Sequence, residues 1–319
     1  MPVLMKRSPS SVNTRMAMKT VATKFAEYGN ASDILESTKN ASSILPQCGN
    51  PSCRSGWIKL WRSRQSPVLE GKWACSQACM QVITYAAILY EAEGNSSKTM
   101  HRHRVPLGLV LLSQGRITQE QLRKALEAQR KTGTGRLGEW LIRHQAVDED
   151  HVARALGSQW NCPVLMGSPH DPITMAAVLP RLLVDHFGAV PLRLAGRGLL
   201  YVAFEDKIDR CLIFAIERML GLKVEAGVLR DSEFRRVRQE ALNVSFPKTR
   251  LLEATSMRGL VHAVATMLEE RRALHSRIVR IHNYFWLRIR RHSVATDDKK
   301  ILPAGENVED MVCALYANE

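Results

Sequence analysis

The stretch PLGLVLLSQGRITQEQLRKALEAQ, residues 106–129, is followed closely by RLGEWLIRHQAVDEDHVARALGSQ, residues 136–159. The second stretch is a copy of the first, and equivalent positions lie thirty residues apart in the chain. Identical residues pair as Leu107 with Leu137, Gly108 with Gly138, Leu111 with Leu141, Ala125 with Ala155, Leu126 with Leu156, and Gln129 with Gln159. The same supersecondary unit is therefore expected twice.

Each copy predicts a short helix, a turn near Gly115 or Gln145, and a longer helix. Thr118 and Gln121 form the capping-box pattern at the start of the first long helix. Within the long helices the apolar positions recur at helical spacing and define one buried face. A glutamine ends that face in both copies, and a polar amide at such a place requires a hydrogen-bond partner. The repeat therefore predicts a four-helix subdomain over residues 106–165.

The whole chain of 319 residues predicts a mixed α+β multidomain protein. The expected parts are a disordered basic arm (1–45), a zinc-ribbon-like module (46–93), a linker (94–105), the four-helix repeat (106–165), a small α+β subdomain (166–246), and a C-terminal helix and tail (250–319). In the α+β subdomain a hairpin is predicted at Gly196-Arg197-Gly198, and a helix is predicted to end at Gly221. Asp231-Ser232 is a candidate helix cap, and the element order is β-β-α-β-α.

The repeat resembles the tandem motif at the N-terminus of the type II secretion and type IV pilus assembly ATPases, the GspE/PilB/MshE family. The tract AVPLRLAGRGLLYVAFEDKIDRCLIFAIERMLGLKVEAGVL, residues 189–229, is similar to the second N-terminal subdomain of the same ATPases. The resemblance covers residues 106 to about 245. It implies an MshEN-like domain, in which two 24-residue motifs hold one molecule of cyclic di-GMP. The matching positions here are Leu107, Gly108, Leu111, Gln129, Arg136, Leu137, Gly138, Leu141 and Gln159.

This chain departs from the family pattern at three positions. Pro106 replaces the arginine that begins the first motif, with Arg104 two residues earlier, Gln145 replaces the turn glycine of the second motif, and Val152 replaces a leucine. No string of the form G-x-x-x-x-G-K-[ST] is present, so the chain is not expected to be the ATPase motor. The expected function is that of a non-catalytic regulator or adaptor, which senses cyclic di-GMP or docks to a secretion, pilus or signalling protein.

Four of the seven cysteines occur as two close pairs, Cys48 with Cys53 and Cys75 with Cys79. Two such pairs can bring four thiolates to one tetrahedral zinc ion. In a reducing compartment a metal is favoured over two disulfides. The pairs therefore predict a structural zinc site, and the intervening RSGWIKLWRSR, residues 54–64, is an alternative basic-aromatic surface for nucleic acid.

The formal net charge of +14 favours anionic partners such as nucleotides, nucleic acid or acidic lipid. A zinc-containing nucleic-acid-binding regulator and a purely structural docking adaptor are therefore the alternative functions. No apolar run reaches the about 18 residues that a transmembrane helix requires, and a cytoplasmic location is expected. RIVRIHNYFWLRIRR, residues 277–291, is either an element packed on its own domain or an amphipathic surface segment.

Overall fold

The computed structural model describes residues 48–54, 67–94, 104–196, 198–205, 207–290, 302 and 305–316. The chain divides into two compact units, one formed by Met1–Lys98 with Pro247–Glu319 and the other by Thr99–Phe246. Among the described helices, none has the length and apolar character needed to span a bilayer. The expected arm, most of the linker 94–105, and Trp57 and Trp61 lie outside the described residues.

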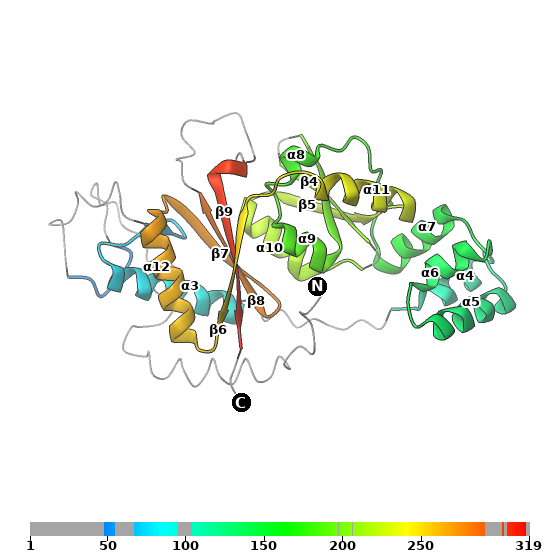
Figure 1. Ribbon diagram of the computed structural model, residues 1–319, viewed down its shortest axis with the longest axis horizontal. Helices are drawn as coiled ribbons and strands as arrows, with labels where there is room; N and C mark the ends of the chain where they lie inside the picture. The colour runs from blue at the N-terminus through cyan, green and yellow to red at the C-terminus, as the bar shows by residue number, and fades with distance from the viewer. Residues whose placement is uncertain are drawn as a thin grey trace. The chain divides into compact units, whose positions relative to one another are not determined.

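The tandem repeat forms four helices, as its sequence predicts (Figure 1). These are α4 (Leu107–Ser113), α5 (Gln119–Thr132), α6 (Leu137–Arg143) and α7 (Glu149–Trp160). The capping box of α5 is confirmed, since the Thr118 side chain accepts from the Gln121 backbone and the Gln121 side chain accepts from the Thr118 backbone. Asp148, the equivalent of Thr118, caps α7 by accepting from the backbone of His151.

The turns within the two copies share one backbone conformation. Gly115 has φ 65° and Gln145 has φ 53°, so both residues lie in the left-handed region. A side chain in that region is disfavoured because its Cβ crowds the backbone, and Gln145 therefore adopts a conformation that suits glycine. The chain retains the turn of the repeat despite the substitution.

The second part of this unit is a small α+β subdomain. It contains α8 (Pro172–Met175), α9 (Arg181–Phe187), β3 (Ala189–Ala195), β4 (Leu199–Phe204), α10 (Arg210–Leu220), β5 (Lys223–Val228) and α11 (Asp231–Leu242). The sheet has the order β3-β4-β5, with an antiparallel hairpin followed by a parallel pair. The predicted order from the hairpin onward and the end of α10 at Gly221, with φ 72°, are confirmed.

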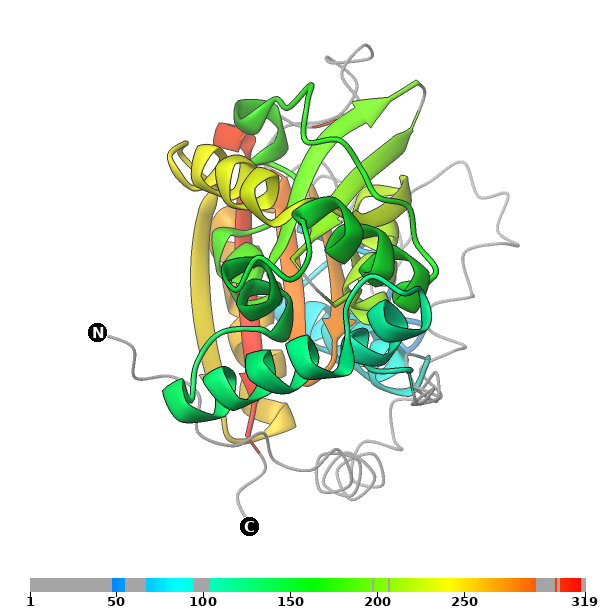
Figure 2. The same cartoon turned by 90° about the vertical axis from the view of Figure 1, so that its right-hand side faces the viewer.

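The other unit combines the cysteine-rich segment with the C-terminal part of the chain. It contains β1 (Val68–Leu69), β2 (Lys72–Trp73), α3 (Gln77–Gly94), β6 (Lys248–Ala254), α12 (Met257–Arg271), β7 (His275–Ile281), β8 (Tyr284–Arg290), the 3-10 helix η4 (Gly305–Asn307) and β9 (Val308–Leu315). The sheet order is β6-β9-β8-β7, which Figure 2 shows from yellow through red to orange. Helices α3 and α12 pack against each other, and both contribute to the core on one face of this sheet.

The prediction of a C-terminal helix and tail over 250–319 is therefore wrong beyond α12. Residues 277–290 begin within β7 and continue through a turn at His282 into β8, and the C-terminal part of the chain contains β9. Both faces of these strands carry buried apolar residues, since Ile278 and Leu287 belong to the core under the helices while Val279 and Trp286 are buried outside that cluster. Arg288 is 2% exposed and pairs with Asp310, so this segment is not an amphipathic surface element.

The predicted module at 46–93 is not a separate hydrophobic unit. One buried cluster contains Trp73, Met80 and Ile83 from this segment together with Leu260 from α12 and Phe285 from β8. Backbone hydrogen bonds also connect the two segments. The Val68 amide donates to the carbonyl of Ala273, and the Glu70 amide donates to that of Ser276. The cysteine-rich segment thus completes the core of the C-terminal sheet.

Candidate functional site: the tandem repeat and a four-cysteine cluster

The helices of the repeat pair across the two copies. The short helix α4 of the first copy packs on the long helix α7 of the second, and α6 of the second copy packs on α5 of the first. The first turns of the two short helices also meet. A Cβ built on Gly108 would lie 3.2 Å from Leu137 Cδ2, and one built on Gly138 would lie 3.6 Å from Leu107 Cδ2. The two motif starts therefore adjoin in a pseudo-two-fold arrangement.

Gly108 and Gly138 keep the helices close to each other. Added Cβ atoms would also lie 2.7 Å from Leu122 Cδ1 and 3.0 Å from Val152 Cγ1, respectively. Leu122 and Val152 are equivalent residues of the repeat, so both glycines perform the same packing task. Close approach of the glycine backbone to a ligand remains a prediction.

The glutamines that end the long helices also have equivalent partners. Gln129 Nε2 donates to the carbonyl oxygen of Gly135 at 2.8 Å, and Gln159 Nε2 donates to that of Val105 at 2.7 Å. Gly135 and Val105 each immediately precede the first residue of a motif. The paired glutamines therefore fix the backbone at both motif starts, which accounts for the polar end of the apolar face.

The four motif leucines have two kinds of position. Leu111 and Leu141 are 0% exposed and form the centre of the small helical core. Leu107 and Leu137 are half-buried and lie beside the adjoining helix starts. Leu111 and Leu141 therefore hold the four helices together, and a ligand contact by Leu107 and Leu137 stays a prediction.

Arg136 immediately precedes α6 and lies among carboxylates. Its Nη2 is 2.6 Å from Asp231 Oδ1, 3.0 Å from Glu139 Oε1 and 3.2 Å from Glu205 Oε1. Asp231 and Glu205 belong to the α+β subdomain, far from Arg136 in the sequence. Arg235 of α11 joins the same group through Asp231 at 2.7 Å and Glu139 at 2.9 Å. We call Arg136, Glu139, Glu205, Asp231 and Arg235 the carboxylate cage.

Opposite charges shift the pKa values of Arg136 and Glu139 within this cage. Burial alone would lower the pKa of Arg136, but its hydrogen bond to Glu139 and the charges of Glu205 and Asp231 outweigh that effect and raise it. Burial would likewise raise the pKa of Glu139, but Arg136 lowers it below its ordinary value. Arg136 and Glu139 therefore both stay ionised near neutral pH. The charges of the cage link the second motif to the neighbouring subdomain.

Asp231 belongs to the carboxylate cage, although the sequence predicted it as a helix cap. Asp231 was expected to cap a helix with Ser232, but Arg230 occupies the cap position and Asp231 begins α11. Its carboxylate contacts Arg136, while Ser232 Oγ donates to Glu149 at the start of α7. Asp231, Glu205 and Arg235 were not predicted as site residues, because no local motif reveals a partner so distant in the sequence.

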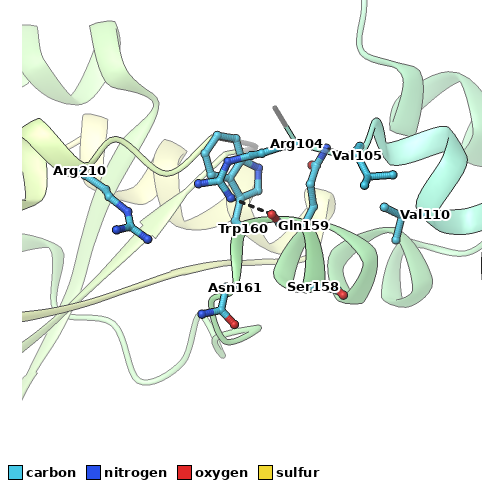
Figure 3. A pocket seen from close by; sticks show the side chains of 8 residues that line it. All are labelled: Arg104, Val105, Val110, Ser158, Gln159, Trp160, Asn161 and Arg210. Carbon is cyan, nitrogen blue, oxygen red and sulfur yellow. Dashed lines mark hydrogen bonds between the residues drawn. The ribbon is translucent and has the colours of Figure 1, made fainter. Parts of the chain in front are cut away.

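The first motif start presents different groups. Pro106 precedes α4 and offers no side-chain cap. Arg104 Nη1 donates to the carbonyl oxygen of Gln159 at 2.7 Å, and its guanidinium carbon lies 3.7 Å from the centroid of Trp160. Arg210, at the start of α10, lies at the same open cavity of about 360 Å³ as Arg104 and Trp160 (Figure 3).

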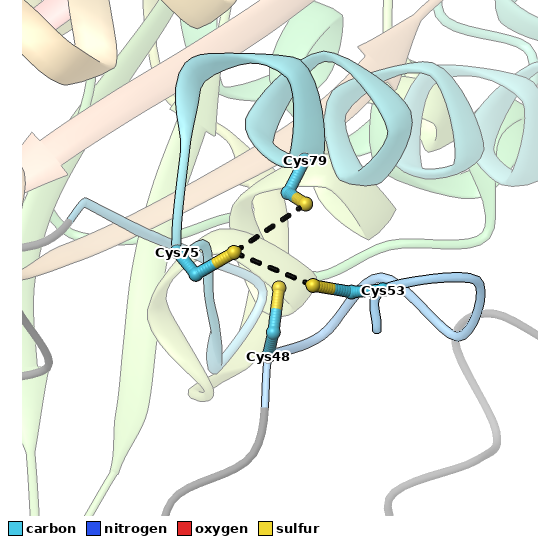
Figure 4. A group of neighbouring side chains, drawn as sticks. All are labelled: Cys48, Cys53, Cys75 and Cys79. Carbon is cyan, nitrogen blue, oxygen red and sulfur yellow. Dashed lines mark hydrogen bonds between the residues drawn. The ribbon is translucent and has the colours of Figure 1, made fainter. Parts of the chain in front are cut away.

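The structure brings the four predicted metal ligands together in the other unit. The sulfur atoms of Cys48, Cys53, Cys75 and Cys79 all lie within 4.8 Å of one another and converge on one point (Figure 4). Cys53 and Cys75 are 3.4 Å apart at Sγ, and Cys75 and Cys79 are 3.6 Å apart. Four thiolates at about 2.3 Å from a tetrahedral zinc ion lie about 3.8 Å from each other. These four described cysteines form no disulfide, and the spacing of their sulfur atoms fits a zinc ion.

Local contacts shape this cluster. Asn50 Nδ2 donates to Cys79 Sγ at 3.3 Å, and the backbone of Gly49 donates to Trp73 at 2.9 Å. A Cβ on Gly49 would lie 2.6 Å from Lys72 Cβ, so the loop of the first pair passes close to β2. Burial raises the pKa of the Cys48 thiol to about 12. A bound cation would reverse that preference by stabilising thiolate.

Sequence comparison finds relatives of the repeat-containing region. No protein-family model matches the chain. The type IV pilus assembly ATPase PilB of Thermus thermophilus is 31% identical over 130 residues, which are 40% of this chain and 14% of that protein. PilB of Myxococcus xanthus is 28% identical over 130 residues, 40% of this chain and 23% of that protein. Part of this chain is similar to the N-terminal region of the GspE/PilB/MshE ATPases.

A bacteriophage adsorption protein and two solved structures are also similar to part of this chain. Bacteriophage adsorption protein B of Escherichia coli K12 is 33% identical over 123 residues, which are 37% of this chain and 16% of that protein. Among solved structures, MshE with cdg is 26% identical with a TM-score of 0.34, covering 43% of this chain and 99% of that one. The N-terminal domain of XpsE is 20% identical with a TM-score of 0.31, covering 42% and 91%. The matched region is less than a quarter of PilB in either organism.

Proposed function

We propose that the tandem repeat binds one molecule of cyclic di-GMP across its two motif starts. The observation that carries this proposal is the adjacency of the two starts, with Gly108 against Leu137 and Gly138 against Leu107. Cyclic di-GMP has two equivalent guanine–phosphate halves related by a two-fold axis. A repeat with its own pseudo-two-fold axis offers each half the same backbone and apolar surface, and the motif resemblance implies this ligand.

Arg136 is the proposed charged contact of the second half-site. A guanidinium can make two parallel hydrogen bonds to a phosphate or to the acceptor edge of guanine. Here it contacts Asp231, Glu205 and Glu139, so an anionic ligand must compete with three carboxylates. Binding would therefore weaken the ion pairs that join α6 to α11. Ligand binding to the repeat would in this way change its contacts with the α+β subdomain.

The chain is further proposed to act without catalysis, as a regulator or adaptor for a secretion, pilus or signalling protein. Similarity to the N-terminal region of pilus ATPases supports this class of partner. The sequence contains no phosphate-binding loop of the Walker type. The proposed output is the ligand-dependent link between the repeat and α11.

We also propose that Cys48, Cys53, Cys75 and Cys79 hold a structural zinc ion. The ion would fix the 48–54 loop to the start of α3, whose apolar residues belong to the core under the C-terminal sheet. Metal analysis should find one zinc per chain. Cys75→Ser should lower the zinc content and unfold this unit. A purified wild-type chain that is folded and stable but contains no zinc would contradict the assignment.

Calorimetric titration of cyclic di-GMP into the zinc-loaded full chain tests the ligand proposal. Wild-type protein should bind at micromolar concentration or tighter. Arg136→Ala should weaken binding about tenfold or more, because a lost charge-assisted contact costs about 1.5–3 kcal/mol. Arg123→Ala is the matched control. The Arg123 side chain on α5 is 70% exposed, and its ion pair with Glu127 is long, at 4.0 Å. Absence of binding by folded protein would contradict the proposal and leave the repeat as a docking scaffold.

The same titration separates the nucleotide from nucleic acid. Cyclic di-AMP should bind weakly, since it lacks the guanine edge. A ligand that makes few phosphate contacts should show a shallow dependence on salt concentration, whereas nucleic-acid binding weakens by decades. A preference for DNA or RNA with a steep salt dependence would favour the nucleic-acid alternative.

A further inference from the structure

The two halves of the repeat differ where a ligand would enter. Val110 and Trp140 are equivalent residues, as are Arg104 and Thr134. In the second half, Trp140 Nε1 donates to the carbonyl oxygen of Thr134 at 3.0 Å, and a Cβ on Gly135 would lie 2.9 Å from Trp140 Nε1. The indole therefore covers the backbone beside the second motif start. The smaller Val110 borders an open cavity at the first start.

The open cavity has groups suited to a planar anion. Its volume of about 360 Å³ falls at the lower end of the range for small-molecule sites, about 300–1,000 Å³. Trp160 and Arg104 stack within it, while Arg210 and Asn161 lie on its wall (Figure 3). Among the described residues that line this cavity, none is acidic. This distinguishes it from the carboxylate cage around Arg136.

These groups match the parts of a guanine nucleotide. An indole face can stack on a purine base, as aromatic side chains do in proteins that bind single-stranded nucleic acid. Guanidinium groups recognise phosphate oxygens in a fixed bidentate geometry. The side-chain amide of Asn161 offers both a donor and an acceptor to the edge of the base.

We propose that this cavity is the first half-site for cyclic di-GMP, and this inference rests on the proposed function of the repeat. Arg104 supplies the guanidinium that Pro106 removes from the motif. Arg104 donates to the backbone carbonyl of Gln159. The side-chain amide of the same Gln159 donates to the backbone carbonyl of Val105, just before α4. Trp160 stacks on one guanine, and Arg104 and Arg210 contact the adjoining phosphate. The first half-site thus regains its charge from residues outside the 24-residue motif.

Filling the cavity provides the sharpest test. Val110→Trp introduces the side chain that the second copy carries at the equivalent position. This variant should fold and should weaken cyclic di-GMP binding about tenfold or more by occupying the cavity. Arg104→Ala should produce a similar loss without added bulk, and Arg123→Ala should bind like wild type. Far-UV circular dichroism of each variant checks that the helices remain.

The position of the ligand has its own readout. Indole ¹H–¹⁵N signals, assigned with Trp160→Phe, should show a large shift of Trp160 on addition of cyclic di-GMP. If the wild type binds and Arg136→Ala weakens binding, but Arg104→Ala, Val110→Trp and the Trp160 signal show no effect, the half-site is wrong and the proposed function stands. If the wild type does not bind, the proposed function fails and the half-site fails with it.

Discussion

The two copies of the repeat have the same packing but different polar surroundings. In both, a buried leucine, a packing glycine and a terminal glutamine occupy equivalent places. The second copy places Arg136 among carboxylates of the neighbouring subdomain, whereas the first has Pro106 and an Arg104–Trp160 stack. Duplication thus preserves the scaffold, while contacts from outside the motif give each half a separate character.

The largest expected effect tests whether the buried leucines of the two repeat copies pack equivalently. Leu111→Ala and Leu141→Ala should each lower the local stability of the four helices by about 2–5 kcal/mol, because each creates a cavity in the same small core. Hydrogen exchange of the α4–α7 amides measures this loss. Leu109→Ala is the control, since Leu109 is 51% exposed on α4. A large difference between the two buried sites would contradict equivalent packing.

The carboxylate cage should compete with ligand only in the second copy. Asp231→Asn removes one of three carboxylates from Arg136 and should raise the affinity for cyclic di-GMP up to about tenfold, or about 1.4 kcal/mol. Asp185→Asn is the control, because Asp185 pairs with Arg181 and Arg238 rather than with Arg136. Calorimetry measures both variants. Weaker binding by Asp231→Asn would show that the cage positions Arg136 for the ligand.

The paired glutamines provide a smaller test. Gln129→Ala and Gln159→Ala each remove one hydrogen bond to a backbone carbonyl, which is worth about 0.5–1.5 kcal/mol. Local stability from hydrogen exchange should fall by similar amounts in both variants. Gln119→Ala, at an exposed position on α5, should have little effect. Loss at only one glutamine would show that the two motif starts are held differently.

The smallest effect concerns the turns. Gln145→Gly should raise stability by about 0.5–1 kcal/mol, because glycine tolerates the positive φ at this position. Gly115→Ala should lower stability, because alanine does not tolerate the positive φ at that position. Thermal melting of the full chain follows both changes. Shifts of the same sign would mean that the turns are not equivalent.

The sequence was sufficient for features set by local patterns. Helix periodicity, the Thr118 capping box, the Gly196–Gly198 hairpin and the end of α10 depend on neighbouring residues and were predicted. The two cysteine pairs converge as their spacing suggests. Each of these features is encoded within a short segment, where a single side-chain preference decides the outcome.

Features that depend on distant segments were not predictable. The cage joins Arg136 to Glu205 and Asp231, and nothing near Arg136 indicates those partners. Strand β9 contains Glu309 and Asp310, which are buried in ion pairs with arginines of other elements, so its sequence alone resembles a charged tail. The cavity at Arg104 also takes Arg210 from the α+β subdomain, and nothing within the repeat indicates that residue.

Native mass spectrometry of the zinc-loaded chain with cyclic di-GMP most directly tests the claim that two unequal halves form one site. We expect a single dinucleotide per chain at saturation. At a ligand concentration near the wild-type dissociation constant, Arg136→Ala and Arg104→Ala should each strongly reduce the bound fraction. Two dinucleotides per chain, or none on a folded and zinc-loaded protein, would contradict this claim.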